Sequence, residues 1–182
     1  MYLPTVSRRV VEPSPFTSRR VAKSGPSACQ GHDRPRRLAA KKALLRPAVI
    51  FNGHQAKCAA IAFGACLADL NIACWACAVL QDHVHLVVGP SRIHGDELTA
   101  ELKRWATRAL VADGLHPFQS EQDETGRVPK CWQVNGWPVW KYTPDQVRGT
   151  IRYVEVNPLK EVKPRQVWPF VVPYTEGSEE PS

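Results

Sequence analysis

The sequence contains no run of 18 apolar residues, the length that a membrane-spanning helix needs, so no membrane span is expected. No hydrophobic signal peptide precedes its six cysteines, so we expect a cytoplasmic protein whose thiols are reduced. Cys74 and Cys77 have the spacing of half a zinc knuckle, but a second pair is missing. Three residues apart on a strand, their side chains should point to opposite faces. The cysteines are therefore predicted to be small buried hydrophobic residues.

The chain beyond residue 47 has no excess of positive charge. Residues 1–47 hold 11 Lys and Arg against 2 Asp and Glu, a net charge of +9, whereas the whole chain carries +7, which leaves −2 for residues 48–182. Residues 1–47 are rich in Pro, Ser and Arg and lack hydrophobic periodicity, so we predict a basic, largely disordered N-terminal arm. Such an arm is either a solvated tail or a sequence-independent attachment to phosphates.

Residues 48–165 are predicted to form one domain, followed by an extended C-terminal tail at 166–182. The hydrophobic pattern predicts, in order, a strand at 48–51, a helix at 54–70, strands at 72–80 and 83–89, a helix at 96–113, a strand or hairpin at 131–142 and a helix at 143–158. The short link Gln81-Asp82 indicates an antiparallel hairpin, and Pro158 is expected to end the last helix near Asn157. This order predicts an α+β sandwich with a mainly antiparallel central sheet flanked by helices.

Two histidines stand in the apolar stretch "LQDHVHLVVGP" at Leu80–Pro90. Because side chains alternate along a strand, His83 and His85 should project from one face while Val84 projects into the core. Two neutral imidazoles held in this way are half of a metal site. The competing interpretation is a pair of partly buried, hydrogen-bonded histidines.

The last predicted helix carries a polar face beside its apolar stripe. At about 100° per residue, Tyr153 and Asn157 lie four residues apart on one surface, away from Val147 and Val154. Gly149 leaves space beside the phenol. Taken alone, Tyr153 is better interpreted as a tyrosine at the edge of the core with its hydroxyl in water.

Together the two motifs resemble those of the single-tyrosine transposases with a His-hydrophobic-His (HUH) motif, and most closely the REP-associated tyrosine transposases. "DHVHLVV" is similar to the HUH motif, and "IRYVEVNPLK" is similar to the later Tyr-x-x-x-Asn-Pro signature. The motif order, the long intervening helix and the preceding hairpin also match, over roughly residues 45–165. The family usually has Met-Pro before the first motif, whereas Leu80-Gln81 stand here.

The resemblance implies an HUH endonuclease-like, ferredoxin-like fold and a metal-dependent transposase that cleaves and rejoins single-stranded DNA. Tyr153 would be the nucleophile that forms a 5′-phosphotyrosine, and His83, His85 and Asn157 would hold Mg²⁺ or Mn²⁺. The partner would be single-stranded or hairpin DNA, the location the nucleoid, and the protein a monomer or a homodimer. The residues name no clear base for the tyrosine, and Asp82 and a metal-bound water are both candidates.

Basic and aromatic side chains offer further DNA contacts. The arginines and lysine that could neutralise phosphates are Lys103, Arg104, Arg108, Arg148 and Arg152, whose competing interpretation is a solvated helix face. Trp137 and Trp140 are candidates for stacking on unpaired bases, whereas Trp75 and Trp105 are expected in the core.

Two other functions remain open. A histidine-triad nucleotide hydrolase uses three alternating histidines on a strand, but here Val87 occupies the third position. A non-catalytic DNA-binding protein derived from a transposase would have no need for all four of His83, His85, Tyr153 and Asn157.

Overall fold

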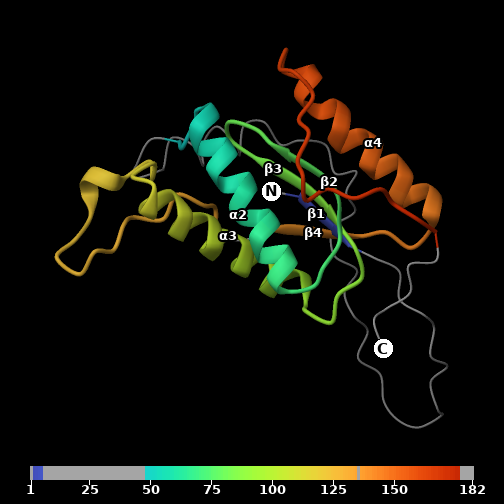
Figure 1. The fold of residues 1–182 in the computed structure, drawn as a ribbon, viewed down its shortest axis with the longest axis horizontal. Coiled ribbons are helices and arrows are strands. Elements are labelled where there is room, and N and C mark those ends of the chain that lie inside the picture. Colours follow the sequence, from blue (N-terminus) through green and yellow to red (C-terminus); the bar gives the residue numbers. More distant parts are fainter. Residues whose placement is uncertain (1, 6–47, 135, 177–182) are drawn as a thin grey trace, which may run out of the picture. The chain divides into compact units, whose positions relative to one another are not determined.

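The computed structural model describes residues 2–5, 48–134 and 136–176. The elements are β1 (Tyr2–Thr5), α2 (Gly53–Asp69), β2 (Cys74–Val79), β3 (Val84–Val88), α3 (Gly95–Ala112), the 3₁₀ turn η1 (Gln119–Glu121), β4 (Trp137–Trp140) and α4 (Pro144–Lys160) (Figure 1). All of them belong to one unit that joins the N-terminal strand to the chain from Val49 onward. The predicted α+β class is confirmed. Strand β1 lies within the predicted N-terminal arm, and residues 6–47 of that arm lie outside the described residues.

The four strands form one mixed sheet in the order β2-β3-β1-β4. β2 and β3 pair antiparallel, and Leu80 N–H donates to the His83 carbonyl at 2.8 Å across the turn, so the predicted hairpin is confirmed. β1 runs parallel to both β3 and β4, so the prediction of a mainly antiparallel sheet is wrong. A ferredoxin-like sandwich would need a first strand antiparallel to β3. Residues 6–52 separate β1 from α2, so no short connection fixes the direction of β1.

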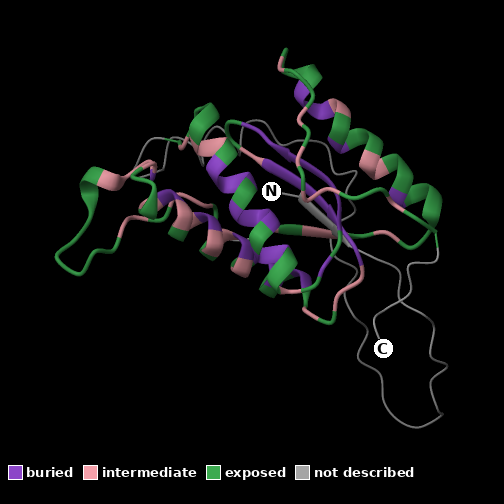
Figure 2. Cartoon of the chain, viewed as in Figure 1, coloured by how far each residue is buried: buried purple, intermediate pink, exposed green. Residues whose placement is uncertain are grey.

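Helices cover the two faces of this sheet. The ribbon shows α2 and α3 on one side of the strands and α4 on the other (Figure 1). β2 and β3 are buried along their whole length, whereas much of α4 is exposed (Figure 2). The larger core lies under α2 and α3, and a smaller apolar cluster joins α4 to β2 and β3.

Each long helix forms where the sequence supplies a cap and an apolar stripe. Asn52 and Gln55 make a reciprocal capping box at the start of α2, with both bonds at 2.9 Å. In α3 the residues that face the core are Leu98, Leu102, Ala106 and Leu110. Thr143 caps α4, and Pro144 stands at its first position.

Two predictions about short segments, the strand at 48–51 and the opposite faces of Cys74 and Cys77, are wrong. Residues 48–51 do not form a strand, although Phe51 is buried and its N–H donates to the Gln81 carbonyl at 2.7 Å. Cys74 and Cys77 lie in the same core cluster because an irregularity between Cys74 and Ala76 breaks the alternation of β2. Both are buried, as expected, and burial raises the pKa of the Cys74 thiol to about 12.

Pro158 led us to expect that helix α4 ends near Asn157. The helix instead continues to Lys160. Proline at this position removes one N–H donor and disfavours helical geometry at the preceding residue. Burial of Val154, Asn157 and Pro158 against the rest of the protein offsets that local cost. The extra turn adds Lys160 and the C-cap residue Glu161 to the helix, which matters for the candidate site.

The segment after α4 closes the outer edge of β2. The Gln166 side chain acts like a neighbouring strand, since its amide accepts from Val79 N–H and donates to the Val79 carbonyl, both at 2.8 Å. Trp168 Nε1–H donates to the Cys77 carbonyl at 3.2 Å, and Val172 N–H donates to the Cys74 carbonyl at 2.8 Å. These bonds satisfy backbone groups that an open sheet edge would leave unpaired.

In the part of the chain that the structure describes, no helix has both the length and the apolar character to cross a membrane.

The packing of Phe170 on α2 is tested at Gly64. A Cβ at this position would lie 2.6 Å from Phe170 Cγ and 3.0 Å from its Cβ, so rotation of the ring alone cannot relieve the clash. We expect Gly64→Ala to lower the free energy of unfolding by roughly 1–3 kcal/mol. The matched control is Gly149→Ala in α4, where a Cβ meets nothing within 4 Å. There the better helix propensity should stabilise by roughly 0.5–1 kcal/mol. Urea denaturation measures both, and equal stability of the two variants would contradict the packing.

Candidate functional site

His85 in β3 and His83 immediately before this strand lie at the face of the sheet that α4 covers. Val84, Leu86 and Val88 belong to the core under α2 and α3, whereas Val87 belongs to the cluster under α4. His85 shares the parity of Val87 and is only 3% exposed. The His83 and His85 rings are perpendicular neighbours, with centroids 4.9 Å apart.

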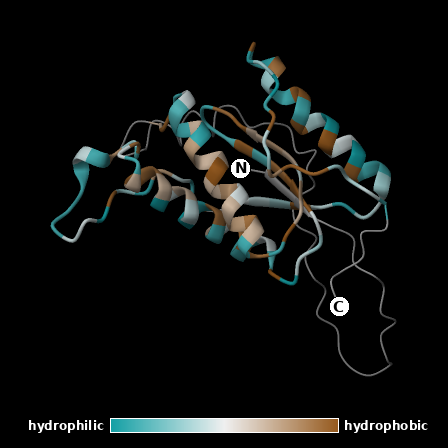
Figure 3. Cartoon of the chain, in the orientation of Figure 1, coloured by the Kyte–Doolittle hydropathy of each residue, from teal (hydrophilic) through white to brown (hydrophobic). Residues whose placement is uncertain are grey.

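α4 supplies the other two residues of the site. Val147 and Val154 pack against Ala76, Ala78 and Val87 and so hold the helix on the sheet. In Figure 3 the helix is otherwise largely hydrophilic, which agrees with a narrow apolar stripe.

This docking brings the sequence-predicted residues together. The Tyr153 ring lies edge-on to His85, with centroids 5.4 Å apart, and the tyrosine remains 45% exposed. Asn157 is buried, and its Nδ2 lies 3.4 Å from His83 Nε2. The four predicted residues therefore form one cluster, although 74 positions separate Asn157 from His83.

Asp82 orients the His83 ring. Its Oδ1 lies 2.7 Å from His83 Nδ1, so a neutral His83 carries its proton on Nδ1 and donates it to the carboxylate. The lone pair then remains on Nε2, the atom that faces Asn157. A carboxylate behind a histidine in this way is the usual support of a metal-ligating imidazole.

Burial keeps His85 in the form that can bind a metal. Desolvation, together with the nearby His83 and Lys160, lowers the pKa of His85 to about 4 from its ordinary 6.5. His85 is therefore neutral at physiological pH, as a metal ligand must be.

The extended end of α4 adds two charged residues that the sequence did not single out. Lys160 Nζ lies 4.3 Å from the centroid of the Tyr153 ring. Glu161 joins Asp82 and His83 in a candidate metal-binding group, whose ligand atoms lie within 4.8 Å of one another. The spacing of seven residues between Tyr153 and Lys160 could have identified Lys160 from the sequence, because it places the two residues two turns apart on one helix face if Pro158 does not end the helix.

The donor set of this cluster fits a divalent cation. His83 Nε2, His85 and the Asn157 amide provide nitrogen and oxygen ligands, and rotation of the amide can turn its oxygen toward a cation. The carboxylates of Asp82 and Glu161 supply negative charge beside His83. This combination suits Mg²⁺ or Mn²⁺ better than a soft metal.

The five basic residues predicted to bind DNA do not form one surface. Lys103 lines a cavity of about 70 Å³ with Asp82 and His83, and its Nζ donates to the Gln133 carbonyl at 2.7 Å. Arg104 pairs with Glu101, and Arg108 is exposed one turn further along α3.

The two arginines of α4 lie over a groove of about 730 Å³ on the opposite face of the sheet from α3. Arg148 is paired with Asp145 and Glu176. Arg152 lines the groove near Trp75 and Tyr174, whose rings are 4.7 Å apart.

The four tryptophans have the exposure or burial that was predicted for them, whereas the stacking of Trp137 and Trp140 on bases stays a prediction. Trp137 and Trp140 are exposed, at 47% and 38%, so both rings are accessible. Trp75 is buried under α4, and Trp105 packs against the larger core, as expected.

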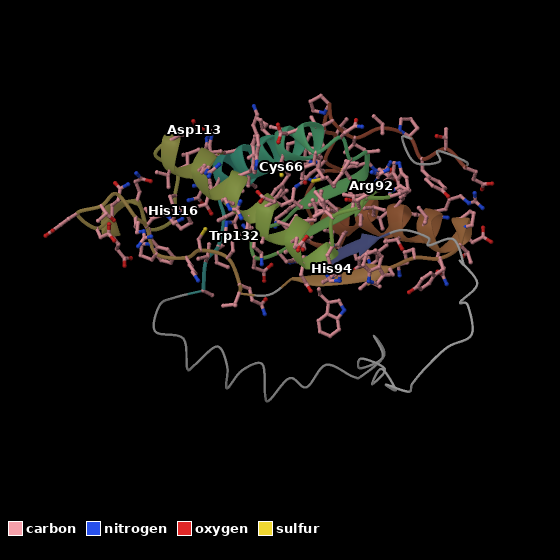
Figure 4. The ribbon with its side chains drawn as sticks, turned by 90° about the horizontal axis from the view of Figure 1, so that it is seen from below. Cys66, Arg92, His94, Asp113, His116 and Trp132 are labelled. Atoms are coloured by element: carbon pink, nitrogen blue, oxygen red, sulfur yellow. The ribbon has the colours of Figure 1, made fainter. Side chains whose placement is uncertain are left out.

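Apart from Tyr2, whose position in β1 pairs with His85 in β3, the other described histidines and tyrosines lie away from the cluster. His94 caps the start of α3, and His116 is buried beyond the end of that helix (Figure 4). His54 is exposed on α2. Tyr142 precedes the first residue of α4, about three turns from Tyr153, and Tyr174 packs on Trp75.

A scan against protein-family models and searches of the curated proteins and of the solved structures found no match to this chain.

The lowered pKa of His85 predicts a pH dependence of stability. Between about pH 4 and 6.5 the unfolded chain binds a proton at this residue that the folded protein does not, so stability falls as the pH drops through this window. In the absence of divalent metal, the contribution of His85 to this loss between pH 7 and pH 4.5 should be about 2.5 kcal/mol, and His85→Asn should remove that contribution. Urea denaturation at pH 7 and pH 4.5 measures the effect.

A second variant, His116→Asn, measures the separate contribution of His116, because burial also lowers the pKa of this residue and acts in the same direction. An unchanged pH dependence in His85→Asn would contradict the assignment to His85.

Proposed function

We propose that this protein is a metal-dependent single-stranded DNA endonuclease and transposase of the HUH type, with Tyr153 as its nucleophile. The observation that carries the proposal is the meeting of two distant segments. An accessible phenol contacts one strand histidine, while an amide of the same helix contacts the other. The resemblance of both segments to the motifs of REP-associated tyrosine transposases supplies the reaction.

The chain's own residues would act as follows. Tyr153 Oη would attack the phosphorus of a DNA phosphodiester in line, and the bond from phosphorus to the 3′ oxygen would break. The phenol gives up its proton, and the departing 3′ oxygen takes up a proton from solvent. A 5′-phosphotyrosine and a free 3′-OH result. The covalent bond conserves the energy of the phosphodiester, so a 3′-OH of another strand can reverse the step and join the ends.

His83, His85 and Asn157 would hold the cation beside this tyrosine. Bound Mg²⁺ or Mn²⁺ supplies Lewis-acid polarisation and orientation of the phosphate. Asp82 holds the His83 ring in the tautomer that leaves Nε2 free to ligate.

The fold gives this proposal partial support. Its elements β2, β3, α3, β4 and α4 follow in the order expected of an HUH endonuclease, and α4 covers the histidine face. The direction of β1 differs from that of a ferredoxin-like sheet, so this fold description is not part of the support. The histidine-triad alternative is weakened because Val87, at its third position, lies in the apolar cluster under α4.

Metal binding is the first test. Titration calorimetry with MnCl₂ should show at least a roughly 10-fold loss of affinity in His83→Ala and in His85→Ala, because each removes a ligand. His54→Ala, an exposed histidine on the other side of the sheet, should bind like the wild type. Loss of affinity in Glu161→Gln but not in His85→Ala would instead place the cation in the group of Asp82, His83 and Glu161.

DNA cleavage is the decisive test. We expect 3′-labelled single-stranded DNA with an internal hairpin and randomised flanks to form, in MnCl₂, an adduct that survives denaturing electrophoresis. The adduct should vanish in Tyr153→Phe and persist in Tyr142→Phe. Binding of this DNA without any adduct would favour the non-catalytic DNA-binding alternative, and an adduct that persists in Tyr153→Phe would overturn the choice of nucleophile.

A further inference from the structure

The lysine that contacts the ring of the candidate nucleophile is at none of the basic positions that the sequence pattern favoured. Lys160 is exposed, and its Nζ lies 4.3 Å from the centroid of the Tyr153 ring. Lys160 and Tyr153 are seven residues apart on α4, which is two turns of one helix face. The same ring lies 5.4 Å from the His85 ring, centroid to centroid. One phenol therefore contacts both an ammonium group and a candidate metal ligand.

The neighbouring acid does not neutralise this ammonium group. The Glu161 carboxylate pairs with Lys163 at 2.6 Å, and no ion pair joins Lys160 to another described residue. The ring contact is weak compared with a charged partner, because an exposed cation–π contact contributes only about 0.5–1 kcal/mol. Lys160 is thus a pre-positioned cation that can exchange its ring contact for an anion.

We propose that Lys160 binds a non-bridging oxygen of the scissile phosphate and holds that phosphate over Tyr153. This inference rests on the proposed function. Lys160 and His85 both contact the Tyr153 ring, so a phosphodiester held at this phenol would meet the ammonium group together with a cation bound by His83, His85 and Asn157. Charge develops on these oxygens as the phenol attacks, so a fixed ammonium group stabilises the transition state more than the ground state.

The continuation of α4 past Pro158 is what provides this residue. A helix that ended at Asn157 would leave Lys160 in the following loop, without a fixed register to Tyr153. The buried Pro158 and Asn157 anchor the last turn, while Lys160 on its outer side stays accessible.

The test compares Lys160→Ala and Lys160→Arg with Lys57→Ala in the full-length protein. Lys57 is exposed on α2, across the sheet, and its removal changes the net charge equally. With the DNA that the wild type cleaves, single-turnover adduct formation in MnCl₂ should fall roughly 10²-fold in Lys160→Ala. Lys160→Arg should recover much of the rate, and Lys57→Ala should match the wild type.

Two further measurements separate phosphate binding from a structural role. In a Tyr153→Phe background, the slope of log Kd against log salt should decrease by about 0.7 in Lys160→Ala, the value for one contact to single-stranded DNA. The Mn²⁺ affinity and the thermal midpoint of Lys160→Ala should not fall, since the lysine ligates nothing and packs only on an exposed ring.

The outcomes distinguish this inference from the proposed function. If the wild type forms no adduct, the proposed function fails and Lys160 loses its role with it. If the wild type forms the adduct and Lys160→Ala forms it equally fast, the role of Lys160 alone is overturned. A slow Lys160→Ala that also loses Mn²⁺ affinity would likewise overturn it in favour of a structural role.

Discussion

The alternation of side chains along β3 is the constraint on which the candidate site depends. The strand is buried on both faces, so the residues that anchor it in the core under α2 and α3 oblige the two histidines to face α4. A shift of one residue in the pairing with β2 would exchange the two sets and bury the imidazoles among leucines. The hairpin bond between Leu80 and His83 and the pairing of Val79 with Val84 fix that register.

Helix α4 can lie close to the histidines because the facing side chains of β2 are small. Ala76 and Ala78 leave room for Val147 and Val154, and the helix needs few other apolar contacts. Its exposed surface is then free for polar residues, which the proposed reaction on a charged substrate requires. The close packing of α4 buries His85, and this burial lowers its pKa and keeps the imidazole in the neutral form that can act as a ligand.

The end of α4 shows how tertiary packing overrides a local rule. Proline disfavours the helical conformation of the residue before it, and from the sequence this predicted an end near Asn157. Burial of Asn157 and Pro158 makes the helical path the better one, and it carries Lys160 and Glu161 into the candidate site. Neither residue could be assigned from the pattern, because their positions depend on a turn that local preference disfavours.

The sequence by itself determined the class of the fold, the hairpin, the three long helices and the parity that places His83 and His85 on one face, because these follow from periodicities of two and of 3.6 residues. It also indicated Tyr153 and Asn157 as neighbours, since i and i+4 share a helix surface. Only the tertiary structure decided which helix covers which face, the parallel direction of β1 and the contact of Tyr153 with His85. Those features arise from pairings between residues far apart in the chain, for which no local pattern in the sequence carries a signal.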